Sequence, residues 1–541
     1  MLTLRKIIND AEKHLFWLVL ILAVTVSIFI RFVYQAKAIV VWDEGFHSEW
    51  IYWLSDAARA GSWADFWQIS KSSFHYPPLF LWIMVLPTFI EPVSIASIRF
   101  VNLLFYILSA ITVYLLALST STKYKRIIGL LSAGIFIFSP MSITFATIAL
   151  REMMGVFFTL TTLLIYIYSY KKRPIYLLLT SVSFVVLSLV KYNFGILLFS
   201  AYFLSEAFEL VIVKRRAKTF ARFFIVSVPY AVFLIWWVFI YHDKFGHLLK
   251  LLQNETVYTA GLTDITGYLL FYPRAVVLFY SPSVFFGVLA LVGFAFGIYF
   301  IKNSPMRLMW LYAAVNIILG TIHTENVQER YIFTIFPCIF IVGISVLVEI
   351  WIRIYRFFSH KNLRFLPQII LLVFSVIGIY DLVRLPGLVY AVGSYTNKVA
   401  LYNEIGFKDL WFDYNRSHWR FPLPEEKTEK PYDVFEYIAK TVDLTKPVSF
   451  IGETNELSQP YRNILFSEFK RSGISPQLAP REFTVVTTVS PTSKFYTHDY
   501  KLQHIWKVQN RFIVDADPTW EKIAEKEFKD LGVKIEIFGR K

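Results

Sequence analysis

Two adjacent carboxylates, Asp43 and Glu44, follow directly after the first long apolar stretch of the chain. Adjacent carboxylates repel each other, so they favour solvent or a bound cation. In a partly dry cleft, the pKa of such a carboxylate can be tuned so that it removes a proton from a hydroxyl or an amine. We therefore take Asp43 as a candidate general base with Glu44 in support, although an isolated acidic pair also fits a solvated loop.

Further ionisable side chains lie at the ends of later apolar segments. Singly, each fits an interfacial charge, because Arg and Lys near helix ends reach towards lipid headgroups. Together they are harder to dismiss, because ionisable groups beside membrane helices are costly and usually face an internal cavity or pathway. They are Arg99, Arg151, Glu152, Lys191, His323, Glu325, Glu329 and Arg330.

Cations and carboxylates at one depth of a membrane suit a phosphate on a lipid carrier, whose headgroup lies at the interface. Arg and Lys bind phosphate oxygens by charge-assisted hydrogen bonds. They also stabilise the negative charge that grows on a departing phosphate. A carboxylate across the site can deprotonate the attacking nucleophile.

The composition requires a membrane to hold these residues. The chain has 541 residues, of which 56% are hydrophobic and 17% are charged, against about 25% charged in soluble proteins. Residues 15–390 are a series of apolar stretches of spanning length, whereas residues 391–541 have an ordinary composition. We therefore expect a transmembrane body over 1–390, with an outer loop over 35–94, and a soluble domain over 391–541.

The net charge of +15 does not indicate nucleic acid, because the basic residues lie in short runs between apolar segments. This distribution follows the positive-inside rule. The single cysteine, Cys338, excludes an intramolecular disulfide. The first apolar run exceeds a signal peptide's usual length and indicates an uncleaved signal anchor.

Eleven crossings from a cytoplasmic N-terminus put every basic connector on the cytoplasmic side. This count requires residues 77–91 to form a short re-entrant or interfacial helix, because they rise only about 22 Å, less than the roughly 30 Å hydrocarbon core. The loops that carry the candidate residues, and the terminal domain, then face outward. The predicted crossings are 15–34, 95–118, 127–147, 152–170, 175–190, 194–213, 222–241, 273–301, 306–322, 331–352 and 366–390.

The terminal segment alternates strand-like and helix-like patterns, which indicates a small α/β domain. Its predicted helices are 433–442 and 521–529, and its predicted strands are 447–452, 483–488 and 533–538.

Four short motifs resemble, in order, those of the polyprenol-dependent glycosyltransferases of the GT-C fold, which include protein O-mannosyltransferases and aminoarabinose transferases. Asp43-Glu44 resembles their Asp-Glu motif in the first outer loop. His75-Tyr76-Pro77-Pro78 is similar to their His-Pro-Pro segment, with Tyr76 inserted. The segments 98–102, containing Arg99, and 330–337, beginning with Arg330, are similar to their Arg-Leu-Pro-Ser and Arg-Tyr-Leu-Leu…Pro helix starts.

The resemblance implies a multi-pass protein of the cell (plasma or inner) membrane with an extracytoplasmic active site. It implies inverting transfer of a sugar from a polyprenyl-phosphate donor to a protein, lipid or glycan acceptor. Asp43 would be the base, supported by Glu44, and the donor phosphate would contact Arg99, Lys191 and Arg330. The supporting residues would be His75, Arg151, Glu152 and His323.

Two questions stay open at this stage. A divalent cation (Mg, Mn or Zn) could use Asp43, Glu44 or His75, but no spacing identifies one. The alternative function is a lipid or glycolipid transporter or flippase, which predicts ionisable residues near the bilayer midplane and paired half-helices. The candidate residues gather at one interface instead, which favours the enzyme.

Overall fold

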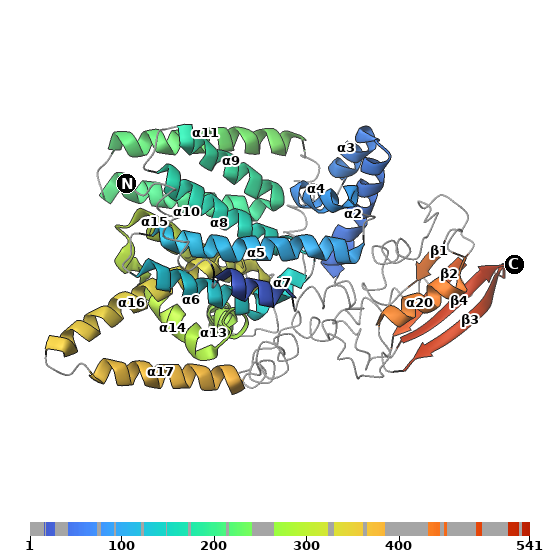
Figure 1. The fold of residues 1–541 in the computed structure, drawn as a ribbon. Helices are drawn as coiled ribbons and strands as arrows, with labels where there is room; N and C mark the ends of the chain where they lie inside the picture. Colours follow the sequence, from blue (N-terminus) through green and yellow to red (C-terminus); the bar gives the residue numbers. More distant parts are fainter. Residues whose placement is uncertain are drawn as a thin grey trace.

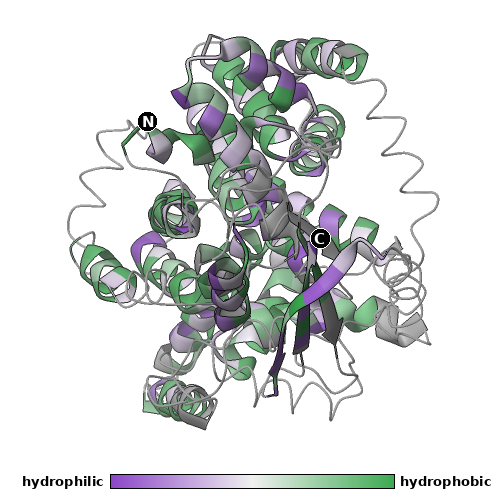
Figure 2. Ribbon diagram, turned by 90° about the vertical axis from the view of Figure 1, so that its right-hand side faces the viewer, coloured by the Kyte–Doolittle hydropathy of each residue, from purple (hydrophilic) through white to green (hydrophobic). Residues whose placement is uncertain are grey.

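The computed structural model describes residues 16, 18–27, 42–72, 77–90, 94–120, 124–147, 149–170, 175–212, 216–240, 265–322, 329–360, 365–384, 431–443, 448–451, 483–489, 518–529 and 533–541. Most of them form a helical bundle, and a small sheet lies beyond one end of it (Figure 1). The bundle helices are largely hydrophobic (Figure 2). Helices are expected for such segments, because in lipid a backbone must satisfy its own hydrogen bonds.

Among the described residues, five helices are long and apolar enough to cross a membrane, by length and composition. They lie within α5 (Ile95–Ser119), α8 (Arg151–Ser169), α10 (Tyr192–Ile212), α11 (Arg216–Ile240) and α16 (Phe336–His360). The bundle also contains α6 (Lys125–Phe138), α7 (Pro140–Thr147), α9 (Ile175–Val190), α13 (Ile265–Ala275), η2 (Val276–Tyr280), α14 (Val284–Ala295), η3 (Phe296–Phe300), α15 (Ser304–Ile322), η4 (Glu329–Ile332) and α17 (Phe365–Arg384).

Two predicted crossings differ from the observed helices. The segment 127–147 is divided at Ser139 into α6 and α7, since proline at 140 cannot donate the hydrogen bond that would continue the first helix. The segment 273–301 is divided after Tyr280, and α14 restarts behind Ser283, whose hydroxyl accepts from the Phe286 N–H at 3.4 Å. Eleven crossings remain a prediction.

The predicted outer loop contains α2 (Trp42–Arg59), α3 (Trp63–Ser72), α4 (Leu79–Val85) and the 3-10 helix η1 (Leu86–Phe89). The predicted short helix is confirmed, with Pro78 at its N-cap. Its end is fixed by Arg59, which donates to the carbonyl of Thr88 from Nε at 3.0 Å and Nη2 at 2.7 Å. Helix α4 packs against α2, α5 and α9, and so joins the outer segment to the bundle.

Helices α14 and α16 cross at a close contact between small residues, as is common in membrane bundles. Gly293 of α14 lies against the backbone of Gly343 in α16, and Gly343 lies against the carbonyl of Ala290. A methyl group at either glycine would overlap backbone atoms of the other helix.

We expect Gly343→Ala to destabilise the protein by about 1–3 kcal/mol, because overpacking must separate the two helices. The matched control is Gly134→Ala in α6, where an added methyl group meets no atom within 4 Å. That change should be neutral or stabilise by about 0.5–1 kcal/mol, since alanine favours the helix. Thermal unfolding in detergent measures both, and equal midpoints would contradict the close contact.

The terminal segment contains α20 (Pro431–Thr441) and a four-stranded sheet in the order β1-β2-β4-β3. Strand β1 (Val448–Ile451) is parallel to β2 (Phe483–Val489), whereas β4 (Val533–Arg540) is antiparallel to both β2 and β3 (Trp520–Phe528). Of the two helices and three strands predicted here, one helix and the three strands are confirmed. The soluble domain as a separate outer unit stays a prediction.

The predicted helix over 521–529 is wrong, because these residues form the edge strand β3. Glu, Lys and Ala favour helix, and the three least exposed residues, Trp520, Ala524 and Phe528, recur at a helical spacing of four. The antiparallel pairing with β4, which has a bulge between Lys522 and Ala524, overrides that propensity. Charged side chains are usual on an edge strand, since they discourage further pairing.

Candidate active site

Glu44 is fully buried in α2 and accepts three hydrogen bonds. Arg99 of α5 donates from Nε at 2.8 Å and from Nη2 at 2.9 Å, which is a bidentate ion pair. The backbone N–H of Ala149 donates to the same carboxylate at 2.8 Å. Glu44 therefore ties α2 to α5 and to the segment that leads into α8.

Local sequence explains why Arg99 and α8 lie where they do. Ser94 caps α5, because its hydroxyl accepts from the Ser97 N–H at 3.1 Å while the Ser97 hydroxyl accepts from the Ser94 N–H at 2.9 Å. Asn102, one turn beyond Arg99, donates from Nδ2 to the carbonyl of Leu150 at 2.8 Å. The start of α8 is thereby fixed against the start of α5.

The first turn of α8 carries Arg151 and Glu152, both buried. The guanidinium of Arg151 lies over the ring of Phe80 in α4, with Cζ 5.6 Å from the ring centre. Glu152 lies opposite Lys191, the residue between α9 and α10, with Oε1 3.3 Å from Nζ.

A third cation, Arg330 of η4, lies close enough to Lys191 for its charge to act on it. The ring of Tyr331 is near both cations, with its centre 5.8 Å from the Lys191 Nζ and 5.8 Å from the Arg330 Cζ. The Phe194 ring backs Lys191 at 5.2 Å. Burial lowers the pKa of Lys191, Glu152 raises it, and the charges of Arg330 and Arg151 lower it further. Three cations therefore act on one another.

Glu152 pairs with Lys191, and the charges of Arg151 and Arg330 act on the same lysine. We call Arg151, Glu152, Lys191 and Arg330 the cation cluster. Several fixed cations in a site of low dielectric constant suit a phosphate group, because charge-assisted hydrogen bonds are strong there. The Glu44–Arg99 pair adjoins the cluster, because Ala149, which it holds, is two residues from Arg151.

The structure thus brings together four of the predicted site residues as the cation cluster and places two more, Glu44 and Arg99, in an adjoining ion pair. Asp43 lies in α2, but its side chain is outside the described atoms, as are His75 and His323. The prediction missed Tyr331 as a contact of two cations, although Tyr331 stands within the motif that begins with Arg330.

No group of three or more His, Cys, Asp and Glu side chains within the described residues could hold a metal ion. Two of the three predicted candidates, Asp43 and His75, fall outside that search. The divalent cation therefore stays a prediction.

Comparisons with known proteins address the fold and the class. The model of the dolichyl-phosphate-mannose-protein mannosyltransferase family matches residues 63–248. No curated protein sequence matches the chain. The apo crystal structure of ArnT from Cupriavidus metallidurans is similar at 13% identity and a TM-score of 0.56, over 96% of this chain and 97% of ArnT.

A second ArnT structure, with undecaprenyl phosphate bound, is similar at 13% identity and a TM-score of 0.53, over 96% of this chain and 98% of ArnT. The archaeal oligosaccharyltransferase AglB from Archaeoglobus fulgidus, in complex with an inhibitory peptide and a dolichol-phosphate, reaches a TM-score of only 0.45 at 10% identity, over 92% of this chain and 71% of AglB. The chain is thus a multi-pass membrane protein with the GT-C fold, as its motifs predicted, and its residues 63–248 match a family of sugar-transferring enzymes.

Proposed function

We propose that the protein transfers a sugar from a polyprenyl phosphate to an acceptor at the outer face of the cell membrane, with inversion at the anomeric carbon. The observation that carries this proposal is the cation cluster, where Glu152 pairs with Lys191 and the charges of Arg151 and Arg330 act on the same lysine. A phosphate on a lipid suits a group of cations beside membrane helices. The ArnT structure with undecaprenyl phosphate supports the same class of donor.

In the proposed reaction, an acceptor oxygen or nitrogen forms the new bond to the anomeric carbon while the bond to the phosphate oxygen breaks. The departing polyprenyl phosphate takes the electron pair, and Lys191 and Arg330 stabilise its negative charge. Asp43 takes the proton from the acceptor. One displacement inverts the configuration at the anomeric carbon.

Arg99 takes a different part in this proposal from the one that its motif suggested. The Nε and Nη2 atoms of Arg99 both donate to Glu44, and the Arg99 side chain is almost fully buried. We assign Arg99 to holding Glu44, and hence the helix that carries Asp43, rather than to the donor phosphate.

The need for a divalent cation has its own test. Treatment with EDTA, followed by addition of each metal in turn, shows whether Mg, Mn or Zn is needed for activity.

The orientation rests on charge. The positive-inside rule puts the basic connectors in the cytoplasm. Arg151, at the start of α8, and Lys191, directly before α10, then face outward. An impermeant thiol reagent applied to intact cells, with cysteine introduced near each end of α11 in turn, tests this orientation.

The test of the function is release of free polyprenyl phosphate from a panel of polyprenyl-phosphate sugars by the purified protein. We expect Lys191→Met to lower kcat/KM for the active donor by about 10- to 100-fold, since a hydrogen bond to a charged group contributes roughly 1.5–3 kcal/mol. Lys302→Met, at an exposed lysine that follows η3, is the matched control and should change little.

Two outcomes would contradict the proposal. Unchanged kcat/KM in Lys191→Met would remove the cation cluster from donor binding. Tight lipid binding without release from any donor, in the presence of protein, lipid and glycan acceptors, would favour the transporter instead.

A further inference from the structure

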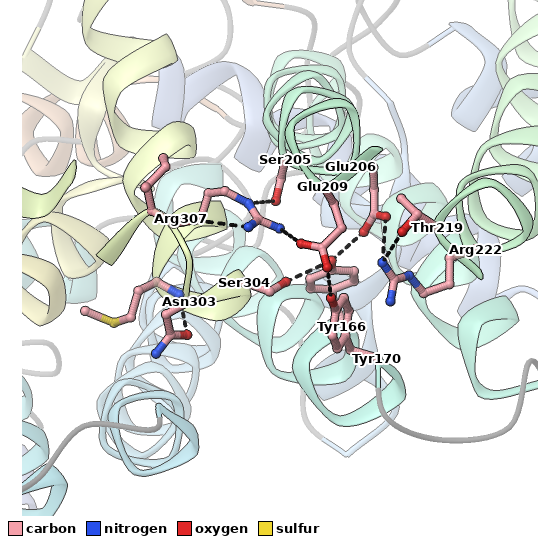
Figure 3. A network of polar contacts seen from close by, with 12 residues as sticks. Tyr166, Tyr170, Ser205, Glu206, Glu209, Thr219, Arg222, Asn303, Ser304 and Arg307 are labelled. Carbon is pink, nitrogen blue, oxygen red and sulfur yellow. Dashed lines mark hydrogen bonds and ion pairs between the residues drawn. The ribbon is translucent and has the colours of Figure 1, made fainter. Parts of the chain in front are cut away.

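A second buried group of charges lies far from the candidate active site, among α8, α10, α11 and α15 (Figure 3). Six residues form it, and we call them the tyrosine–glutamate–arginine network. They are Tyr166, Tyr170, Glu206, Glu209, Arg222 and Arg307.

One half of the network surrounds Arg307 of α15, which is fully buried. Its Nη2 donates to Oε2 of Glu209 in α10 at 2.7 Å, and its Nε donates to the Ser205 hydroxyl at 3.0 Å. Its Nη1 donates to the carbonyl of Ile301 at 3.0 Å. The other oxygen of Glu209 accepts from the Tyr170 hydroxyl of α8 at 2.9 Å.

The other half surrounds Glu206, one turn earlier on α10. Its Oε2 accepts from Nη2 of Arg222 in α11 at 3.1 Å, and its Oε1 accepts from the Tyr166 hydroxyl of α8 at 2.6 Å. The guanidinium of Arg222 also lies over the Tyr170 ring, with Cζ 4.0 Å from its centre. Each carboxylate thus binds one arginine and one tyrosine, and the two halves share α8 and α10.

Three of these helices extend from the network to the candidate active site. About 15 residues, or roughly 22 Å of helix, separate Tyr166 from Arg151 along α8. A similar length separates Glu206 from Lys191, which directly precedes α10. Helix α15 runs a similar length from Arg307 to its end at Ile322, in the segment that leads to Arg330. A shift of one of these helices along its axis would therefore change the distances between residues of the cation cluster.

Apolar packing alone fixes the position of each helix along its axis only weakly, because lipid tails are as apolar as the helix surfaces that they contact. Hydrogen bonds between buried polar groups are directional and are lost when a helix slides by part of a turn. Polar pairs in helical assemblies are best attested as devices that fix register rather than as sources of stability.

We infer that the tyrosine–glutamate–arginine network sets the register of α8, α10 and α15, so that its four charged members are positioning residues for the cation cluster. The inference rests on the proposed function, since the cation cluster is there the donor-phosphate site. The new point is that a network at the other ends of these helices positions the residues of the cation cluster.

The test replaces one ion pair by apolar residues of similar size, in the double variant Arg307→Met/Glu209→Leu. Such a replacement often leaves stability unchanged, whereas removal of one partner leaves a buried charge. We expect the KM for the polyprenyl-phosphate sugar to rise about 10-fold, with kcat changed less and the thermal midpoint close to that of wild type. The matched control is Arg353→Met/Glu349→Leu, a partly exposed pair in α16 with the arginine Nε 3.5 Å from the glutamate Oε1, which should leave the KM unchanged.

The outcomes separate register from mere stability. A KM that stays at the wild-type value, whether or not the thermal midpoint falls, would overturn the inference, as would an equal rise in the control. If the double variant does not fold, Tyr166→Phe/Tyr170→Phe removes one hydrogen bond from each carboxylate and should raise the KM about 3-fold. Wild-type protein that releases no polyprenyl phosphate would contradict the proposed function itself, because the variants are compared only after the wild type is active.

Discussion

Asp43→Asn is expected to lower the rate of sugar transfer by about 10²- to 10⁴-fold, the usual contribution of a general base. Glu44 is poorly suited to that task, because both of its oxygens are bound in the Arg99 ion pair and one also accepts from Ala149. We therefore expect Asp43, the carboxylate directly before Glu44 in the helix, to take the proton from the acceptor. The measurement is single-turnover release of polyprenyl phosphate.

Binding separates this role from a structural one. Asparagine keeps the size of the side chain and removes its charge, so the affinity for polyprenyl phosphate should stay within about threefold of wild type. The residual rate should also no longer rise with pH in the range where the base loses its proton. A rate within tenfold of wild type would indicate Glu152 as the base instead, and Glu152 would then have to give up its ion pair with Lys191.

The sequence was sufficient to predict which ends of which helices meet. The positive-inside rule and the length of each apolar stretch placed Arg151, Glu152, Lys191 and Arg330 at one depth, and the structure brings the four together. Periodicity also located the short helix after Pro78 and most of the terminal sheet. These features depend on composition and local pattern, which a single sequence contains.

Partnerships between distant residues could not be predicted in this way. Nothing in the local pattern distinguishes an arginine that binds phosphate from Arg99, whose partner Glu44 lies 55 positions away. Arg307 is a sharper example. It lies at the start of the predicted crossing 306–322, and the structure buries it fully against Glu209, 98 positions away.

The sequence does contain one signal of these buried partners. Glu206 and Glu209 lie one turn apart inside an apolar helix, where carboxylates are expensive unless they are paired. That spacing alone indicates two buried partners, even though it does not identify Arg222 and Arg307.

The largest effect on stability is expected at the ion pair beside the site. Arg99→Met should lower the free energy of unfolding by about 3–5 kcal/mol, because it leaves the fully buried carboxylate of Glu44 without the guanidinium that neutralises it. The contacts between α2 and α5 should loosen with it. Thermal unfolding in detergent and the yield of folded protein measure the change.

Two comparisons test the physical cause of that loss. Arg353→Met breaks an exposed pair with Glu349 and should cost at most about 1 kcal/mol. The double variant Arg99→Met/Glu44→Leu removes both charges, so most of the stability should return while activity does not, since the helix that carries Asp43 is no longer fixed by a directional contact. If Arg99→Met is as mild as Arg353→Met, the pair is accessible to water and Arg99 regains its place as a candidate for the donor phosphate.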